Sequence, residues 1–159
     1  MININEKEAE TTLIDTIMTP LPLVVANSSD SIFVISNLMK ERKVGSIIII
    51  NQYNQNYPIG IITERDIVRR VISDNKDPKH TKAMEVMSTP LITTETNTYV
   101  SDVSVKMVNN KIRRLPVVTS KTLSGIVTIT DIIKYFHEKN KENDYLSKAM
   151  IRYSKYWEE

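Results

Sequence analysis

The 159-residue sequence has no cysteine, three glycines, two histidines and an aromatic content of only 6%. Without cysteine it can form no disulfide, thiolate nucleophile or zinc–thiolate cluster. The glycines (Gly45, Gly60 and Gly125) are isolated, whereas a Walker loop or a dinucleotide fingerprint needs clustered glycines to bring backbone N–H groups against phosphate. The sequence also lacks the G-x-S-x-G nucleophile elbow. These absences exclude most common enzyme templates, and we expect no enzymatic activity and no metal site.

Neither charge nor hydropathy points to a nucleic acid or a membrane. The 21 basic and 19 acidic residues leave a net charge of +2, too small to make nucleic acid the default partner. No apolar run approaches the roughly 20 residues that span a bilayer. The N-terminal segment MININEKEAE is polar and acidic, unlike a secretory signal or a transit peptide. We therefore expect a cytoplasmic protein.

The sequence does contain an internal repeat. Residues 59–68 (IGIITERDIV) align with residues 124–133 (SGIVTITDII) at an offset of 65, which pairs Gly60 with Gly125 and Asp66 with Asp131. Upstream, Ile17-Met18-Thr19-Pro20 resembles Val86-Met87-Ser88-Thr89-Pro90. Between these anchors the offset drifts to about 68. The first copy therefore has extra residues, and we expect them in a longer loop at 51–57.

Hydrophobic periodicity predicts the order β-α-β-β-α in each copy. Apolar residues of helical spacing run from Ile32 to Met39 and from Val100 to Val108, with Asp30 and Thr98 as expected caps. One copy of roughly 60 residues would leave apolar surface uncovered. We therefore predict an α+β fold in which two repeats pack about a pseudo-twofold, followed by a C-terminal helical tail. The expected divisions are an arm at 1–12, repeat 1 at 13–75, a linker at 76–82, repeat 2 at 83–137 and the tail at 138–159.

A T-x-x-D element stands at the start of the last helix of each copy, as Thr63–Asp66 and Thr128–Asp131. One interpretation is structural: Thr caps the helix, and the acidic residue three positions on completes the cap. The other is a nucleoside-phosphate pocket. A helix N-terminus attracts phosphate, a carboxylate accepts hydrogen bonds from both ribose hydroxyls, and Arg65 supplies charge to the phosphate. The pattern alone leaves both interpretations open.

The paired pattern M-T-P … G-I-[IV]-T-x-x-D, together with RRLPVV at 113–118, resembles a tandem pair of CBS domains (a Bateman module) over residues 13–136. The resemblance implies a stand-alone regulatory module that binds an adenosyl ligand in clefts between its domains and regulates a partner protein. The ligand would be AMP, ADP or ATP, with S-adenosylmethionine and NAD as alternatives. Such modules usually pair as disc-like dimers, so we expect a homodimer.

The same resemblance assigns roles to individual residues. It places the ribose hydroxyls on Asp66 and Asp131, with Thr63 and Thr128 beside ribose or phosphate. The remaining assignments are Arg65, Thr130, Arg113 and Arg114 near phosphate, and Ile92, Thr93 and Pro116 at the base. Arg65 of the first copy is Thr130 in the second, and Arg113-Arg114 have no basic counterpart in the first. We therefore expect the two sites to differ in affinity.

Two other interpretations remain. A nucleic-acid-binding regulator would use the basic pairs Arg69-Arg70 and Arg113-Arg114, and a structural adaptor would bind no ligand. In the tail, Leu146, Met150, Tyr153 and Trp157 recur at helical spacing. They fit either a helix packed on its own module or a docking element.

Overall fold

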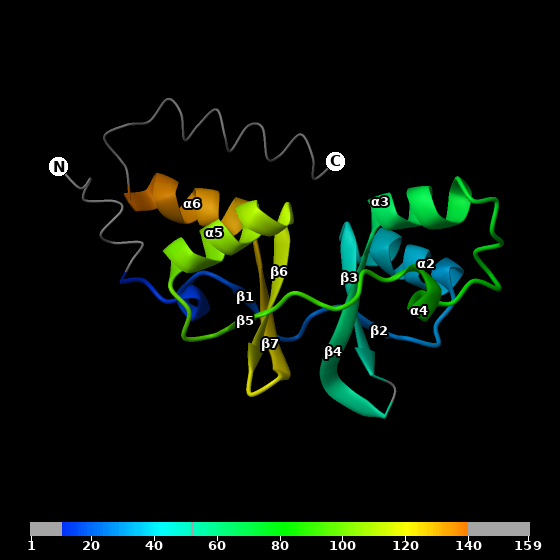
Figure 1. The fold of residues 1–159 in the computed structure, drawn as a ribbon, viewed down its shortest axis with the longest axis horizontal. Helices are drawn as coiled ribbons and strands as arrows, with labels where there is room; N and C mark the ends of the chain where they lie inside the picture. The colour runs from blue at the N-terminus through cyan, green and yellow to red at the C-terminus, as the bar shows by residue number, and fades with distance from the viewer. Residues whose placement is uncertain (1–10, 52, 140–159) are drawn as a thin grey trace. The chain divides into compact units, whose positions relative to one another are not determined.

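The computed structural model of the chain describes residues 11–51 and 53–139. It divides into two compact units, which are shown in Figure 1. Unit 2 comprises Pro22–Ile92 with Lys121–Leu123, and unit 1 comprises the described residues of Met1–Leu21, Thr93–Ser120 and Ser124–Glu159. Within the described residues no helix is both long and apolar enough to cross a membrane. The expected α+β class is confirmed, with the order β-α-β-β-α in each repeat.

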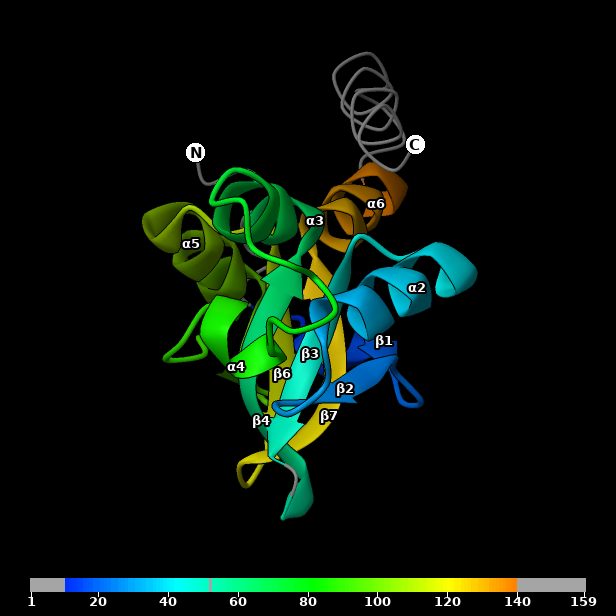
Figure 2. The same cartoon turned by 90° about the vertical axis from the view of Figure 1, so that its right-hand side faces the viewer.

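Unit 2 contains a three-stranded sheet with its helices on one side, as Figures 1 and 2 show. The strand order is β2-β3-β4, with β2 parallel and β4 antiparallel to β3. Its elements are β2 (Val25–Asn27), α2 (Ile32–Arg42), β3 (Ser46–Asn51), β4 (Asn54–Thr63), α3 (Glu64–Ile67), which continues as the π-helical η2 (Val68–Ile72), and α4 (Ala83–Val86).

The core of unit 2 follows from the two-residue alternation along β3 and the helical spacing along α2. Ile47 and Ile49, two residues apart on β3, point to the same side of the sheet and pack in one buried cluster with Ile32, Ile35 and Met39 of α2. The cap of α2 is one residue later than expected: Ser31 accepts a hydrogen bond from the Val34 N–H at 3.3 Å. The expected cap, Asp30, instead accepts from the Asn27 N–H at 2.7 Å and closes the preceding turn.

Unit 1 contains a four-stranded sheet of order β1-β7-β6-β5. In Figure 1 its long helices α5 and α6 lie on one side of β6 and β7. Its elements are η1 (Ile14–Thr16), β1 (Thr19–Pro20), β5 (Thr94–Glu95), α5 (Val100–Asn110), β6 (Arg114–Thr119), β7 (Thr122–Thr128) and α6 (Ile129–Lys139).

Two expectations about α5 were wrong. Its N-cap residue is Tyr99, which makes no side-chain cap. The expected cap, Thr98, lies one residue earlier, and its hydroxyl accepts a hydrogen bond from Thr94 Oγ1 instead. Val108 was expected on the buried face with Val103 and Met107, yet 72% of it is exposed while the other two are buried.

The extra residues of the first copy extend a strand rather than a loop. β3 and β6 each have six residues, but β4 has ten and β7 has seven, which accounts for the whole three-residue difference in offset. The register of β3 against β4 shifts between Ile49 and Asn51. Such irregularities absorb added residues without ending the strand.

The methionine–proline segments, Ile17–Pro20 and Val86–Pro90, each lie in the unit of the other repeat. β1 of the first segment pairs antiparallel with β7, with Thr19 opposite Ile126 and Pro20 opposite Gly125. Ser88 of the second segment bridges to Ile61 of β4. Each methionine–proline segment therefore belongs to a different compact unit from the rest of its own repeat.

The segment expected as a linker, 76–82, packs against the start of α2. Pro78 and Thr81 accept backbone hydrogen bonds from Phe33 and Ile32 at 2.9 Å each, and Thr81 is only 6% exposed. The segment thus satisfies N–H groups at the helix start that have no partner within the helix. At the other end of the chain, Leu146, Met150, Tyr153 and Trp157 of the expected tail lie outside the described residues.

Candidate functional site

The first T-x-x-D element forms a capping box at the start of α3. Asp66 Oδ2 accepts hydrogen bonds from the Thr63 backbone N–H at 2.9 Å and from Thr63 Oγ1 at 2.6 Å. The Thr63 hydroxyl accepts in turn from the Asp66 N–H at 3.3 Å. Reciprocal bonds of this kind satisfy N–H groups that a helix start leaves unpaired, so the capping interpretation is confirmed here.

The second element repeats this geometry at the start of α6. Asp131 Oδ2 accepts from Thr128 N at 2.8 Å and from Thr128 Oγ1 at 2.7 Å, and Thr128 Oγ1 accepts from Asp131 N at 3.4 Å. In both repeats one carboxylate oxygen closes the cap. A carboxylate has two acceptor oxygens, so a cap of this kind leaves Oδ1 for another partner.

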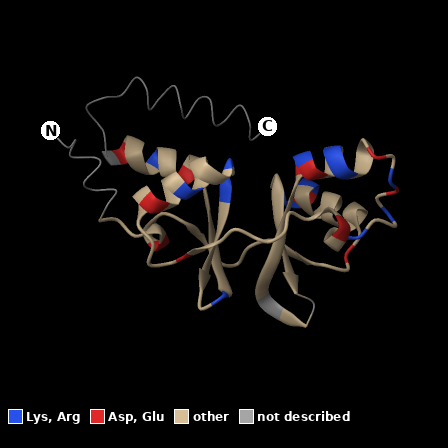
Figure 3. Ribbon diagram, viewed as in Figure 1, with Lys and Arg blue, Asp and Glu red and all other residues tan. Residues whose placement is uncertain are grey.

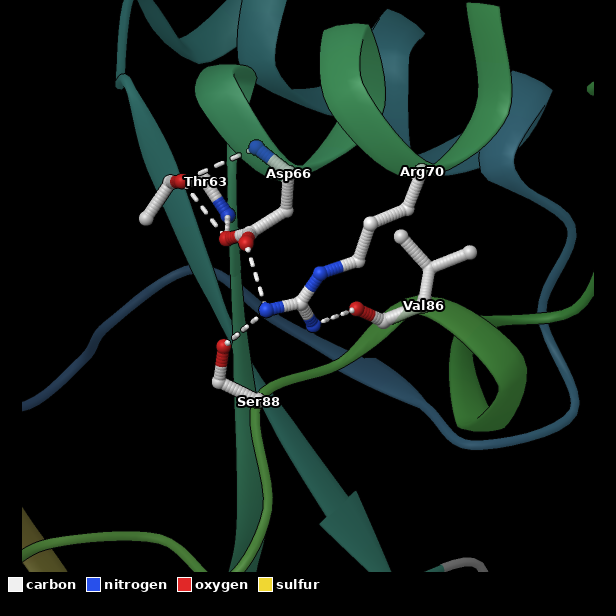
Figure 4. Close-up of polar contacts among 5 residues, drawn as sticks. All are labelled: Thr63, Asp66, Arg70, Val86 and Ser88. Atoms are coloured by element: carbon white, nitrogen blue, oxygen red, sulfur yellow. Dashed lines mark hydrogen bonds and ion pairs between the residues drawn. The ribbon is translucent and has the colours of Figure 1, made fainter. Parts of the chain in front are cut away.

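The two elements differ at that second oxygen. Asp66 Oδ1 pairs with Arg70 Nη2 at 3.2 Å. The same guanidinium donates from Nη1 to the Val86 carbonyl at 2.6 Å and from Nη2 to Ser88 Oγ at 3.2 Å, as Figure 4 shows. For Asp131 Oδ1, the structure has no such partner among the residues that it describes.

The sequence did not reveal this role of Arg70, which was expected only as part of a basic pair that a nucleic-acid-binding regulator would use. The available signal was the spacing: an acidic residue and an arginine four positions apart on a helix lie within reach of each other. At the offset of 65, the counterpart of Arg70 is Tyr135. Tyr135 is 7% exposed, and its hydroxyl lies 2.8 Å from Thr12 Oγ1, which leaves no cation at that position.

The residues expected to bind ribose and phosphate divide between the units. Thr128, Thr130, Asp131, Arg113 and Arg114 share unit 1, where the Ile129 N–H donates to the Arg113 carbonyl at 2.9 Å. This bond places Arg113, and with it Arg114 at the start of β6, beside the start of α6. Figure 3 shows the positive charge at this end of β6. In unit 2 the corresponding bond runs from the Glu64 N–H to the Gly45 carbonyl at 3.3 Å. The strand that follows Gly45, β3, has no basic residue, so this bond brings no positive charge of β3 to the start of α3. Arg65 is exposed on α3.

The residues expected to line a base pocket divide between the two units. Pro116 is buried in β6, whose neighbour β5 begins one residue after Thr93. The Thr93 carbonyl accepts from Lys106 Nζ at 2.6 Å. Ile92 is half-buried and belongs to unit 2. Thr93 and Pro116 thus share a unit with Asp131.

The two repeat glycines contact methionines, a role that the sequence did not suggest. A Cβ on Gly60 would lie 2.6 Å from Met87 Sδ, and one on Gly125 would lie 2.8 Å from Met18 Sδ and 2.7 Å from the Thr19 carbonyl oxygen. Each methionine–proline segment therefore crosses a strand where only glycine leaves room. In the structure the space beside each of these glycines is taken by a methionine side chain. Among the described residues no group of three or more acidic or histidine side chains could hold a metal ion.

Comparison with known proteins decides the family. The family model for the CBS domain matches the sequence twice, at residues 14–73 and 83–138. The chain belongs to the CBS-domain family. An uncharacterized protein of Methanopyrus kandleri is 39% identical to this CBS pair over 113 residues, which cover 70% of the chain and 57% of that protein. The pair thus spans little more than half of that relative's length.

Solved structures share the fold of this CBS pair. A conserved protein of Pyrococcus horikoshii has a TM-score of 0.71 at 29% identity, covering 79% of this chain and 92% of its own. A CBS domain protein of Pyrobaculum aerophilum, complexed with AMP, has a TM-score of 0.69 at 23% identity and coverages of 76% and 89%. The CBS domain of a bacterial CNNM/CorC family Mg²⁺ transporter, in complex with ATP, has a TM-score of 0.73 at 18% identity. The match covers 84% of this chain and 92% of that one. At such low identity the last two likenesses show the fold alone.

Proposed function

We propose that this CBS pair binds an adenine nucleotide (AMP, ADP or ATP) and regulates a partner protein rather than catalysing a reaction. The observation that carries the proposal is the Thr128–Asp131 element. Its carboxylate is oriented by two hydrogen bonds on Oδ2, and the start of β6, with Arg113 and Arg114, lies beside it. A fixed carboxylate suits two ribose hydroxyls, and arginine suits phosphate. AMP and ATP complexes of other CBS proteins support this choice of ligand.

Regulation follows from differential binding. A nucleotide can shift the CBS pair between two conformations, or two partner-binding states, only to the extent that it binds one of them more tightly. The partner protein would then bind the conformation that the nucleotide favours.

The proposal also includes a homodimer. Dimerisation would cover apolar side chains that are exposed on the helices: Phe33 and Val34 of α2, Val68 and Ile72 of η2, and Val105 and Val108 of α5.

The test is calorimetric titration of the protein with AMP, ADP, ATP, S-adenosylmethionine and NAD, with thermal unfolding in parallel. A ligand at 100 times its Kd raises the free energy of unfolding by about 2.7 kcal/mol. Asp131→Asn keeps the size of the side chain but removes its charge, and we expect it to weaken binding at least tenfold. Asp102→Asn is the matched control, because Asp102 is also acidic and in the first turn of a unit 1 helix. Binding that Asp131→Asn leaves unchanged would contradict the assigned site.

The same titrations separate the alternatives. A nucleic-acid-binding regulator predicts affinity for DNA or RNA that falls steeply with salt, but Arg70, one of its expected contacts, is bonded within the fold. A structural adaptor predicts that no nucleotide binds and that Asp131→Asn changes stability alone.

A further inference from the structure

Arg70 is held in place by three groups. Its side chain is 44% exposed, yet its guanidinium reaches Asp66 Oδ1, the Val86 carbonyl and Ser88 Oγ at the same time. Figure 4 shows these contacts converging on one guanidinium from two parts of the chain. An exposed ion pair alone is weak because two long side chains must be fixed. Here the contacts to Val86 and Ser88 already restrict Arg70, so less conformational entropy remains to be lost on pairing with Asp66.

The contact occupies the oxygen that a ligand would need. Oδ2 of Asp66 is bonded to Thr63 N and Thr63 Oγ1, and Oδ1 is paired with Arg70. A ribose bound through this carboxylate would have to displace the guanidinium or share the oxygen with it. Displacement would separate Asp66, only 15% exposed, from the cation that compensates its charge, and a partly buried carboxylate resists such a loss.

The second repeat provides the comparison within the same chain. It has the same cap, with Asp131 Oδ2 bonded to Thr128, but Tyr135 stands in place of Arg70 and turns its hydroxyl to Thr12. The two carboxylates thus share a local fold and differ in the residue four positions later. That residue decides whether Oδ1 is taken.

We propose that Arg70 closes the Asp66 element to ligand, so that each chain binds one nucleotide, at Asp131. This inference rests on the proposed function and adds to it the number of sites and the residue that sets this number. Arg70 is a positioning residue for Asp66, and it adds an internal competitor to the differences in basic residues from which the asymmetry of affinity was expected.

The test is calorimetric titration with AMP, which gives the number of sites per chain. We expect one site in the wild-type protein and two in Arg70→Met, because the change leaves Asp66 Oδ1 without its guanidinium partner. Arg69→Met is the matched control: Arg69 is the preceding exposed arginine of η2 and makes none of the contacts of Arg70. Arg69→Met should keep one site.

Aspartate variants identify which site is filled. In the wild-type background, Asp131→Asn should weaken binding at least tenfold and Asp66→Asn should leave it unchanged. In the Arg70→Met, Asp131→Asn double variant one site should return, and adding Asp66→Asn should remove it. Circular dichroism checks that each variant is folded, and Arg70→Gln serves if Arg70→Met is not.

The outcomes separate this inference from the proposed function. Two sites in the wild-type protein, or one site in a folded Arg70→Met variant, would overturn the role of Arg70 while nucleotide binding stands. Wild-type binding that depends on Asp66 rather than Asp131 would do the same. No binding by any variant would overturn the proposed function, and the inference with it.

Discussion

At the scale of single residues, the repeat motif combines a methionine and a glycine that are distant in sequence. Met18 lies against Gly125 and Met87 against Gly60, each with less space than a Cβ would need. The surroundings of the two glycines differ. At Gly60 the nearest atoms all belong to the flexible Met87 side chain, whereas at Gly125 the nearest is the Thr19 backbone oxygen.

Gly125→Ala should therefore destabilise the protein more than Gly60→Ala. The added methyl at residue 125 would push β1 from its pairing with β7, and overpacking of this kind typically costs about 1–3 kcal/mol. At residue 60 the Met87 side chain can move, which lowers the cost. Urea unfolding of both variants measures the difference. Equal losses would mean that β1 moves as easily as a methionine side chain.

At the scale of elements, the T-x-x-D pattern begins a helix whether or not it also binds a ligand. We expect Thr128→Ala to lower the free energy of unfolding by about 1 kcal/mol, because it removes the hydroxyl that accepts from Asp131 N. Thr128→Ser should restore most of this loss. Thr130→Ala is the control, since Thr130 takes no part in the capping bonds around Thr128. Chemical denaturation gives all three values, and a loss shared by Thr130→Ala would argue against a capping effect.

The segment 76–82 contains a carboxylate, that of Asp77, whose protonation can be followed directly. The Lys79 backbone N–H and the His80 side chain both bond to the Asp77 carboxylate, at 2.8 and 2.7 Å, and they lower the pKa of Asp77 in that order of size. A lowered pKa in the folded state means a contribution to stability that is present above the unfolded pKa. It is lost as pH falls through the folded pKa.

Replacing His80 should therefore raise the pKa of Asp77 without restoring its ordinary value. In His80→Ala the Lys79 N–H, the larger cause, still favours the ionised carboxylate. An NMR titration of the Asp77 carboxyl carbon in the wild type and in His80→Ala measures the change. An unchanged midpoint would show that the pair with His80 does not form in solution.

At the scale of the whole molecule, the exposed apolar helix residues bear on the proposed homodimer. Val68 and Ile72 are 56% and 59% exposed and lie one helical turn apart on η2. Apolar neighbours of this kind are typical of surfaces that another protein covers. The described chain offers a similar pair on α5, where Val105 and Val108 are 58% and 72% exposed.

Light scattering should give a wild-type mass of twice the 18.3 kDa chain. Val68→Glu with Ile72→Glu should halve that mass, because burying two carboxylates in an apolar interface is costly. Lys76→Glu with Lys79→Glu is the control, since both lysines are exposed and lie outside η2. A wild-type monomer, or a dimer that survives both charge insertions, would contradict dimerisation through η2.

The sequence by itself determined the repeat, the order of elements, the family resemblance and the position of the two T-x-x-D caps. These depend on residues close together in the chain: the alternation along β3, the spacing along α2, and the three-residue step from Thr63 to Asp66. The extra residues of the first copy were detected, but their placement in β4 was not, because strand pairing, not composition, decides where added residues go.

Only the tertiary structure decided which residues meet across long sequence separations. It placed each methionine–proline segment against the strand of the other repeat, which explains the glycines by packing, and it brought Val86 and Ser88 to Arg70. The two T-x-x-D elements look alike in sequence because their caps are local. They differ in the structure at the second carboxylate oxygen. Arg70, four residues along the helix, pairs with that oxygen of Asp66, and Val86 and Ser88, which only folding brings near, hold Arg70 in place.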